Sequence, residues 1–509
     1  MRKLFTFLIC ILLISISSCR KDFDTIPSFG NLTFSKDTVF LDTVFTNIGS
    51  STYNLKVYNK SDNAITIPSI SLENGTTSNY RISVDGIAAK DFQNIDILAK
   101  DSIFIFVETT IDYASVSNPL YTDKILFDTG NNQQDVDLVT LVQDAHFIYP
   151  GRNPFSMKID SLTLDGKPTS IQGRFLADSE LTFTNTKPYV IYGYAAIPEN
   201  KTAMIEAGAK LYFHSNSGII VDKKGSLKVN GTINNKVVFE GDRLEHRFND
   251  VPGQWGTIWI REGSINNSIN HAIIKNGIIG LLIDGNESST ITPQMNYQVE
   301  IRNSEIYNHS NFGVLTRQAS VNAYNIVVGS AGMASLACTG GGNYLFSYST
   351  FANYWNNGVR PLPAVLINNF FSSTDQNEQT IIDPKGLFKA DFSSCIIHGN
   401  NNIEFIADRV EGAVFNFNMK HSLIKFNDVD ATFTGVPEMD FTNTALYLNN
   451  VINGFPHFKD ISNNNFIIGQ NSDAIGIGFP FLFGNIEDIL GVIRRPTYDA
   501  GAYQHITFQ

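Results

Sequence analysis

The densest group of side chains that could carry out acid–base chemistry lies between residues 240 and 250. The candidate catalytic residues in this stretch are Asp242, Arg243, Glu245, His246 and Asp250. Carboxylates, an imidazole and a guanidinium held on one projecting loop could form an acid/base pair or a cation site. The same composition is also typical of a solvated hydrophilic loop. The sequence therefore offers candidates here, and their grouping depends on how the loop folds.

A second group of candidates is aromatic. Tyr354 and Trp355 lie in a polar stretch bounded by asparagines, where large side chains are hard to bury, and Trp255 and Trp259 lie upstream. A flat aromatic face exposed on a loop could contact a sugar ring, and the same rings could instead pack locally. Trp255, within Pro252-Gly-Gln-Trp, fits a packing role equally well. These four residues are the predicted ligand-binding candidates.

Other familiar constellations are missing from the sequence. Hydrolysis of a glycosidic bond needs two carboxyl groups that flank the bond, and no adjacent Asp-Asp pair occurs in the chain. The nine histidines include no His-x-His or His-x₃-His pair that would prepare a metal site. We therefore predict no metal site and no cofactor. Calcium is conceivable as a ligand of carboxylates, but no pattern in the sequence supports it.

The amino-acid composition predicts which kind of secondary structure holds these side chains. Of 509 residues, 43% are hydrophobic and only 17% are charged, and the formal net charge is −12. A negative chain without a lysine/arginine block argues against a nucleic-acid partner. The 52 asparagines, of which 38 follow residue 200, and the many glycines and aromatic residues indicate an all-β protein rich in turns.

The N-terminus predicts an address in the cell envelope. Arg2 and Lys3 precede an apolar run too short to span a bilayer as a helix, and Ile16-Ser-Ser-Cys19 follows. This segment resembles the signal peptide and lipobox of bacterial lipoproteins, which implies removal of residues 1–18 and lipidation of Cys19. Residues 19–25 would form the lipidated tether. The resemblance implies an outer-membrane anchor, facing either the periplasm or the exterior.

Residues 26–146 alternate between apolar and polar positions in short runs separated by turn clusters. The run from Thr38 to Phe45 and the run from Ser102 to Val107 are examples. About seven such strands predict a β-sandwich. Their order resembles that of Ig-like domains of the MSP and ASPM–SPD2–Hydin type, which implies a spacer without catalytic residues. Residues 147–202 are expected to form a linker and the N-terminal cap of the next domain.

From residue 203 onward a short apolar core repeats between polar corner residues. Copies begin at His271, Asn303, Asn325, Tyr348, Ser393 and His421, with spacings of 32, 22, 23, 45 and 28. A period of 22–23, with the 45 taken as two periods, predicts about ten stacked rungs of a parallel β-solenoid within residues 203–426. Asparagine suits the corners because it tolerates the left-handed backbone conformation, and stacked copies can bond amide to amide.

The opening and closing segments of this region are recognisable. Ala207–Phe213, Gly225–Thr232 and Pro252–Ile258 resemble the first rungs of secreted right-handed parallel β-helix proteins of the pectate-lyase-like type, and Asp488–Tyr503 is similar to their closing segment. The resemblance implies a β-helix over residues 203–509. Cys338 and Cys395 would then be too far apart to pair, and we predict two buried free thiols.

Two classes of function remain open. The main interpretation is a surface-exposed lipoprotein that presents the β-helix as a binding or structural module, with a glycan or a surface protein as partner. The alternative is a polysaccharide lyase or glycoside hydrolase, because the pectate-lyase-like architecture carries both enzymes and structural proteins. The missing carboxylate signature favours the binding module.

Overall fold

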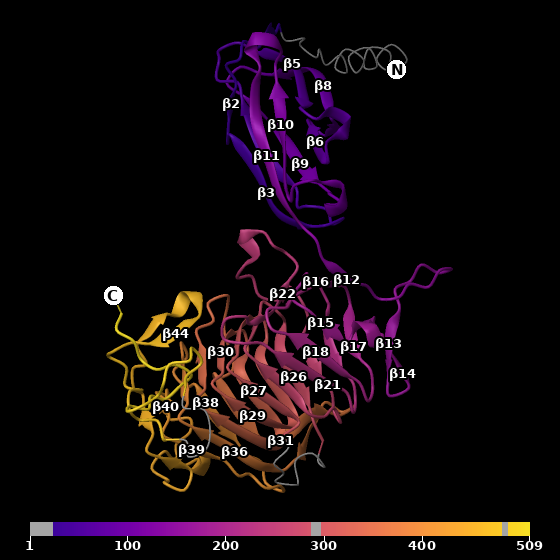
Figure 1. The fold of residues 1–509 in the computed structure, drawn as a ribbon. Helices are drawn as coiled ribbons and strands as arrows, with labels where there is room; N and C mark the ends of the chain where they lie inside the picture. The colour runs from indigo at the N-terminus through magenta and orange to yellow at the C-terminus, as the bar shows by residue number, and fades with distance from the viewer. Residues whose placement is uncertain (1–23, 287–296, 481–486, 509) are drawn as a thin grey trace, which may run out of the picture. The chain divides into compact units, whose positions relative to one another are not determined.

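The computed structural model describes residues 24–286, 297–480 and 487–508 (Figure 1). The described chain is all-β, as predicted, and its helical elements are short 3₁₀ turns. It divides into two compact units, residues 1–144 and 145–509. The predicted lipidation site, Cys19, lies outside the described residues.

The first unit is a sandwich of two sheets. One sheet contains β1 (Ile26–Pro27), β3 (Thr38–Phe45), β5 (Ile65–Leu72), β8 (Asp91–Ile97), β10 (Leu120–Phe127) and β11 (Gln134–Gln143). The other contains β2 (Thr33–Phe34), β4 (Tyr53–Tyr58), β6 (Tyr80–Val84), β7 (Ile87–Ala89) and β9 (Ser102–Thr109). Alternate apolar residues of both sheets, such as Ile67, Ile105 and Val107, form one shared core, as expected of strands with period-2 patterning.

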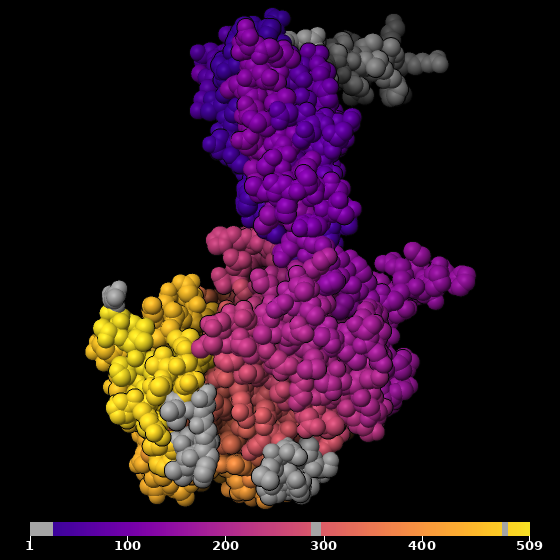
Figure 2. Space-filling model, viewed as in Figure 1, coloured from indigo at the N-terminus to yellow at the C-terminus, as the bar shows by residue number. Residues whose placement is uncertain are grey.

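The second unit is a parallel β-solenoid built from three ladders of stacked strands. The first ladder contains β12 (His146–Ile148), β16 (Tyr189–Ile191), β19 (Lys210–Phe213), β22 (Val237–Gly241), β25 (Ala272–Lys275), β28 (Glu305–His309), β30 (Val327–Ala331), β32 (Thr350–Asn353), β37 (Ile396–Gly399), β40 (Leu423–Ile424) and β42 (Val451–Ile452). In Figure 2 the colour along this unit passes from magenta to orange as rung follows rung.

The other two ladders share two long strands, β29 (Phe312–Tyr324) and β31 (Ala334–Ser347), which run from one ladder into the next. The second ladder also contains β14 (Lys167–Phe175), β17 (Tyr194–Ile197), β20 (Gly218–Val221), β23 (Ile258–Ile260), β26 (Ile279–Asp284), β33 (Val365–Asn368) and β38 (Phe405–Asp408). The third also contains β15 (Thr182–Phe183), β18 (Thr202–Glu206), β21 (Ser226–Asn230), β24 (Asn267–Asn270), β27 (Val299–Arg302), β36 (Leu387–Ser393), β39 (Asn418–Lys420) and β41 (Tyr447–Leu448).

Three hairpin elements and seven 3₁₀ turns complete the described structure. The hairpins are formed by β13 (Ser161–Leu164) with β14, by β34 (Phe370–Thr374) with β35 (Thr380–Pro384), and by β43 (Phe458–Asp460) with β44 (Asn465–Ile468). The turns are η1 (Gly75–Thr77), η2 (Tyr113–Ser115), η3 (Gly130–Asn132), η4 (Asp178–Glu180), η5 (His246–Phe248), η6 (Pro437–Met439) and η7 (Ile461–Asn463).

Three details of the solenoid differ from the prediction. Parallel pairing begins before residue 203, because β12 pairs with β16 and β14 pairs with β17. The spacing of 45 is one rung and not two, because Thr350 pairs directly with Ile396 and the extra residues form the loop after β32 and the β34–β35 hairpin. The described strands of the first ladder between residues 203 and 426 number eight, fewer than the ten or so rungs predicted.

The corner between the third and first ladders confirms the role predicted for the repeat positions. Residues with positive φ occupy this corner in successive rungs, namely His271, Asn303, Asn325, Tyr348, Ser394 and His421. Five of these are the predicted positions, and the copy predicted to begin at Ser393 is shifted by one residue. The Asn325 amide donates to Asn303 Oδ1 at 3.1 Å, and the Asn303 amide donates to Asn270 Oδ1 at 3.1 Å. Asparagine therefore serves both the turn and the stacking, as its composition suggested.

The core is one column of apolar residues inside the three ladders. In the first ladder Phe239, Ile274 and Ile306 stack in register, and all are fully buried. Cys338 and Cys395 are free and buried, which confirms the prediction for these two thiols. The C-terminal segment, whose sequence resembles a closing segment, packs along the first ladder. Its residues Ile489 and Tyr503 pack on Val327 of the first ladder, outside the column.

Candidate functional site

The acid-rich loop between β22 and β23 is folded by contacts among its own side chains and with its neighbours. Asp242 pairs with His214 at 2.8 Å, Arg243 pairs with Glu245 at 2.9 Å, and His246 bonds to Asn249 at 2.9 Å. The bond to Asp242 raises the pKa of His214 above its ordinary value. Four of the five predicted catalytic side chains are thus engaged in three different contacts, and Arg243 and Glu245 share one of them. The loop does not bring Asp242 and His246 into one acid/base pair.

His214 is a neighbour of this loop that the sequence did not single out. Its ring stacks on Tyr192 with centroids 4.4 Å apart, and Tyr192 stacks on Tyr149 at 5.0 Å. No motif marks these residues, because they meet only through the stacking of rungs.

Two of the four predicted aromatic contacts are wrong. Trp255 is fully buried, stacks on Phe213 with centroids 4.5 Å apart, and donates from Nε1 to the Lys275 carbonyl at 2.8 Å. Trp355 is only 8% exposed. Trp255 belongs to the apolar core, and the Trp355 indole is buried as well, so neither can offer a face to a sugar. The polar neighbours of Trp355 were misleading because Asn356 and Asn357 are exposed, whereas Trp355 itself and Asn353 are buried.

Trp259 and Tyr354 remain partly accessible. Trp259 lies on the outer side of the second ladder and donates to Asp284 at 2.7 Å, and it packs with a small apolar cluster around Leu162 and Leu164. Tyr354 instead lines a pocket. It is the one predicted ligand-binding residue that the structure places in a cavity described below.

The pocket lies at the corner where the first ladder ends and the chain crosses to the second, and its volume is about 660 Å³. Its polar side is formed by the ends of β32, β37 and β40, which stack in register through the pairs Asn353–Gly399 and Ile397–Ile424. Its other side comes from the segment around β43. The lining residues are Tyr354, His398, Gly399, Asn400, Lys425, Phe455, Pro456, Phe458, Lys459, Asp460 and Ile461.

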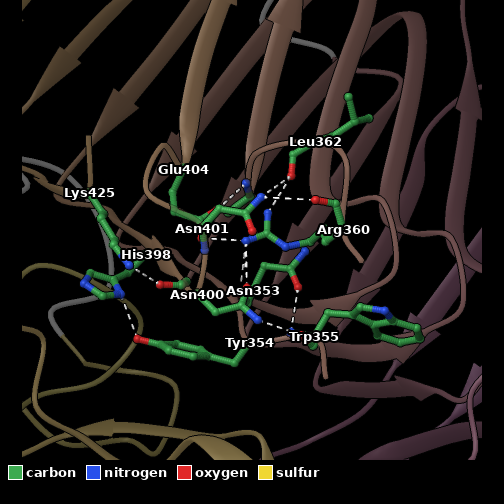
Figure 3. Close-up of polar contacts among 12 residues, drawn as sticks. Asn353, Tyr354, Trp355, Arg360, Leu362, His398, Asn400, Asn401, Glu404 and Lys425 are labelled. Carbon is green, nitrogen blue, oxygen red and sulfur yellow. Dashed lines mark hydrogen bonds and ion pairs between the residues drawn. The ribbon is translucent and has the colours of Figure 1, made fainter. Parts of the chain in front are cut away.

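Tyr354 and His398 form the centre of the polar side (Figure 3). The Tyr354 hydroxyl lies 2.7 Å from His398 Nδ1, and the two rings stack with centroids 5.9 Å apart. Burial lowers the pKa of His398 to about 4, and the nearby ammonium of Lys425 acts in the same direction. Burial also raises the pKa of Tyr354 above its ordinary value. At neutral pH the pair is therefore a neutral imidazole beside a neutral phenol.

Charged and amide groups surround this pair. Lys425 donates from Nζ to the Gly399 carbonyl at 2.7 Å, and burial lowers its pKa. Lys459 is exposed at the opposite side of the pocket. The Asp460 carboxylate caps η7 by accepting hydrogen bonds from the backbone amides of Ser462 and Asn463. Two ammonium groups in one pocket favour an anionic ligand.

A buried ion pair fixes the loops beneath the pocket (Figure 3). Arg360 Nη2 donates to Glu404 Oε1 at 2.6 Å, and the side chains are 1% and 0% exposed. Glu404 also accepts from the backbone amides of Ala364 and Asn401, each at 2.8 Å. Desolvation raises the pKa of Glu404, and the ion pair opposes that rise. Arg360 extends this network to the pocket, because Nη2 also donates to Asn400 Oδ1 at 3.0 Å.

The backbone at Gly399 is part of the same network. A Cβ there would clash with Glu404 Oε1 and with the Asn353 carbonyl. Only glycine therefore allows β37 to end between the ion pair and the preceding rung.

The sequence pointed to Tyr354 alone among these residues. His398 stood in a repeat copy, and Arg360, Asn400, Glu404 and Lys425 carried no signal, because they meet only through the register of three rungs. Among the described residues no group of three His, Cys, Asp or Glu side chains could hold a metal ion. The described part of the chain also contains no helix with the length and apolarity that a membrane crossing requires.

Comparison with known proteins identifies no family. No family model matches the chain, and no curated protein matches it. Among solved structures, XylC in complex with xylose is similar over 84% of this chain and 80% of its own, at 7% identity and a TM-score of 0.33. The catalytic unit of a thermostable GH87 α-1,3-glucanase from Streptomyces thermodiastaticus strain HF3-3 is similar over 72% of this chain and 79% of its own, at 10% identity and a TM-score of 0.19.

A third structure, a family 123 glycoside hydrolase from Clostridium perfringens, is similar over 22% of this chain and 25% of its own, at 12% identity and a TM-score of 0.15. This chain thus matches about a quarter of that protein's length. Similarities this low carry no argument about activity, and the function must be argued from the corner pocket itself.

Proposed function

We propose that this protein binds an acidic polysaccharide, with the corner pocket as its principal site. The observation that carries the proposal is the convergence of Lys425, Lys459 and Asn400 with the half-buried Tyr354 on one cavity. Lysines attract a carboxylate or sulfate, and an amide together with a phenol can hydrogen-bond sugar hydroxyls. The rings of Phe455 and Phe458 supply the apolar wall against which a sugar ring can pack.

The proposed address supports this role. Lipidation of Cys19 would place the protein in the outer membrane, and the first unit would serve as the spacer between anchor and solenoid. Mass spectrometry of the mature N-terminal peptide tests the lipid, and external protease on intact cells tests exposure at the surface. Protection of the solenoid on intact cells would contradict surface display and leave a periplasmic location.

A second candidate function is β-elimination by a polysaccharide lyase. It is favoured by the placement of the hydrogen-bonded Tyr354–His398 pair beside Lys425, because a phenol–imidazole pair can transfer a proton and a lysine can stabilise the carboxylate of the uronate being deprotonated. Glycoside hydrolysis fits less well. Among the described residues that line the pocket, Asp460 provides the one carboxylate, and it already caps η7.

Calorimetric titration with uronate oligosaccharides tests binding, and absorbance of the unsaturated product tests elimination. We expect Lys425→Ala to weaken binding of the oligouronate at least tenfold. The control is Lys420→Ala, because Lys420 is exposed on the third ladder, away from the pocket lining. Equal affinities for the wild type and Lys425→Ala would contradict the proposal. Product formation that His398→Gln abolishes would establish the lyase.

A further inference from the structure

A second pocket lies on the outer face of the third ladder, with a volume of about 610 Å³. It crosses four consecutively paired strands, β18, β21, β24 and β27, of which β18, β21 and β27 are labelled in Figure 1. The residues that determine its chemistry are Thr202, Ser226, Lys228, Asn266, Ser268 and Glu300. They belong to other rungs and another face than the corner pocket, so the two cavities are separate.

Strand register sets the spacing of the polar groups in this pocket. Thr202 lies opposite Ser226, Lys228 lies opposite Ser268, and Ser268 lies opposite Glu300. Neighbouring strands are about 4.8 Å apart, so hydroxyl and charged groups recur at that interval across the strands. This interval is close to the length of one sugar unit in a polysaccharide chain. A linear glycan that lies across the strands can therefore meet a polar group at each unit.

The charges of the pocket are not balanced. Lys224 pairs with Glu199 at 2.9 Å, and Glu300 pairs with Arg302 at 3.3 Å. Lys228 is half-buried at the centre of the row and has no ion-pair partner among the described residues. Its ammonium is therefore the group left to bind an anion. The side chain of Tyr297, half-buried at one end, adds an aromatic wall.

We propose that this pocket is a second glycan-binding site, which takes a hydroxyl-rich oligosaccharide that bears a carboxylate and lies across the four strands. The ligand class rests on the proposed function of the corner pocket, whereas the site itself rests on the register and charge just described. Two sites on separate faces would let one long polymer, or two chains, be held at once, and binding to both would raise the avidity for a polymer above that for a short oligosaccharide.

A reporter inside the pocket tests the proposal directly. Ile265 lines the pocket and is 48% exposed, whereas Cys338 and Cys395 are fully buried. In the mature protein carrying Cys19→Ser, a cysteine introduced by Ile265→Cys is therefore the residue that a thiol-reactive fluorophore would label. Val429→Cys, which is also exposed but lies in another part of the solenoid, is the matched control. The ligands titrated into each labelled protein are a four-unit oligogalacturonate and a four-unit neutral cello-oligosaccharide.

We expect the label at residue 265 to respond saturably to the oligogalacturonate, with at least tenfold weaker affinity in a Lys228→Ala background and unchanged affinity with Lys425→Ala. The label at residue 429 should not respond. The proposal would be overturned if the fluorescence of the label at residue 265 did not change on addition of the oligogalacturonate, or if Lys228→Ala left the affinity unchanged. A response equal for the neutral oligosaccharide would overturn its charge selectivity.

The two proposals fail in different ways. If calorimetry shows binding that depends on Lys425 while the residue 265 label stays silent, the second site is wrong and the corner pocket stands. If the label responds while Lys425→Ala leaves the calorimetric affinity and stoichiometry unchanged, the corner pocket is wrong and the second site stands.

Discussion

The Tyr354 hydroxyl lies 2.7 Å from His398 Nδ1, although 44 residues separate the two in the chain. They meet because β32 and β37 are neighbours in the first ladder, with Ala352 opposite His398. The hairpin β34–β35 and the loop after β32 are therefore excursions from one rung. Removal of this hydrogen bond is the most direct change to the pocket that leaves its shape intact.

Tyr354→Phe should lower the affinity for an oligouronate by about threefold to tenfold. A hydrogen bond contributes about 1 kcal/mol net, and the phenylalanine ring retains the packing on Phe458 and Phe466. Calorimetric titration measures the change. Tyr149→Phe is the control, because Tyr149 is also a solenoid tyrosine but lies outside the pocket lining. An unchanged affinity for Tyr354→Phe would exclude the phenol from ligand contact.

The stability of the solenoid should fall as the pH drops from about 6.5 to 4. Burial lowers the pKa of His398 from 6.5 to about 4, so in this window the unfolded chain binds a proton that the folded chain does not. The contribution is fully present above pH 6.5 and is lost as the pH falls through 4. It amounts to roughly 3 kcal/mol at most. Buried His309 has its pKa lowered in the same way, to about 4.

His398→Gln should make the unfolding temperature of the solenoid less sensitive to pH between 6.5 and 4. Scanning calorimetry at several pH values measures this. An equal acid sensitivity in wild type and His398→Gln would show that His398 is not held neutral.

Arg360→Met should destabilise the solenoid by about 3–5 kcal/mol, because it leaves the fully buried Glu404 without its cation. Glu404→Gln should also be destabilising, because Ala364 donates to Oε2 and Asn401 to Oε1, and a glutamine offers only one acceptor oxygen and leaves Arg360 without its anion. The exposed pair Arg302–Glu300 is the matched control, and Arg302→Met should cost about 1 kcal/mol or less. Denaturant unfolding measures all three, and similar losses for the buried and exposed pairs would contradict the assignment.

Trp255→Ala should destabilise the solenoid by about 3–5 kcal/mol, because it empties a fully buried volume between Phe213 and the corner. Trp259→Ala should cost clearly less, since its indole is partly exposed. The same unfolding experiment compares them. If Trp259 proved the more costly residue, the placement of the two indoles would be wrong.

The thiols of Cys338 and Cys395 should not react with an aromatic disulfide reagent until the solenoid unfolds. Both are fully buried, and burial raises the pKa of each to about 12, so no thiolate forms at neutral pH. Titration with and without denaturant counts the reactive groups. Rapid reaction in the absence of denaturant would contradict the burial.

The sequence by itself determined the class of the fold and the position of its corners. The backbone conformation of a solenoid corner depends on one residue that tolerates positive φ. The corner positions of Asn303 and Asn325 could therefore be predicted from residue type and spacing alone. The free thiols followed from the same regularity. The length of each rung did not, because an insertion such as β34–β35 adds residues without adding a strand to any ladder.

Only the tertiary structure decided which side chains meet. Polar neighbours in the sequence suggested that Trp355 is exposed and that Asp242 and His246 act together, yet Trp355 is buried and Asp242 bonds to His214. His398 and Lys425 come from different rungs and reach Tyr354 through strand register. Register is a long-range property that depends on every insertion between two strands, and local sequence carries no record of it.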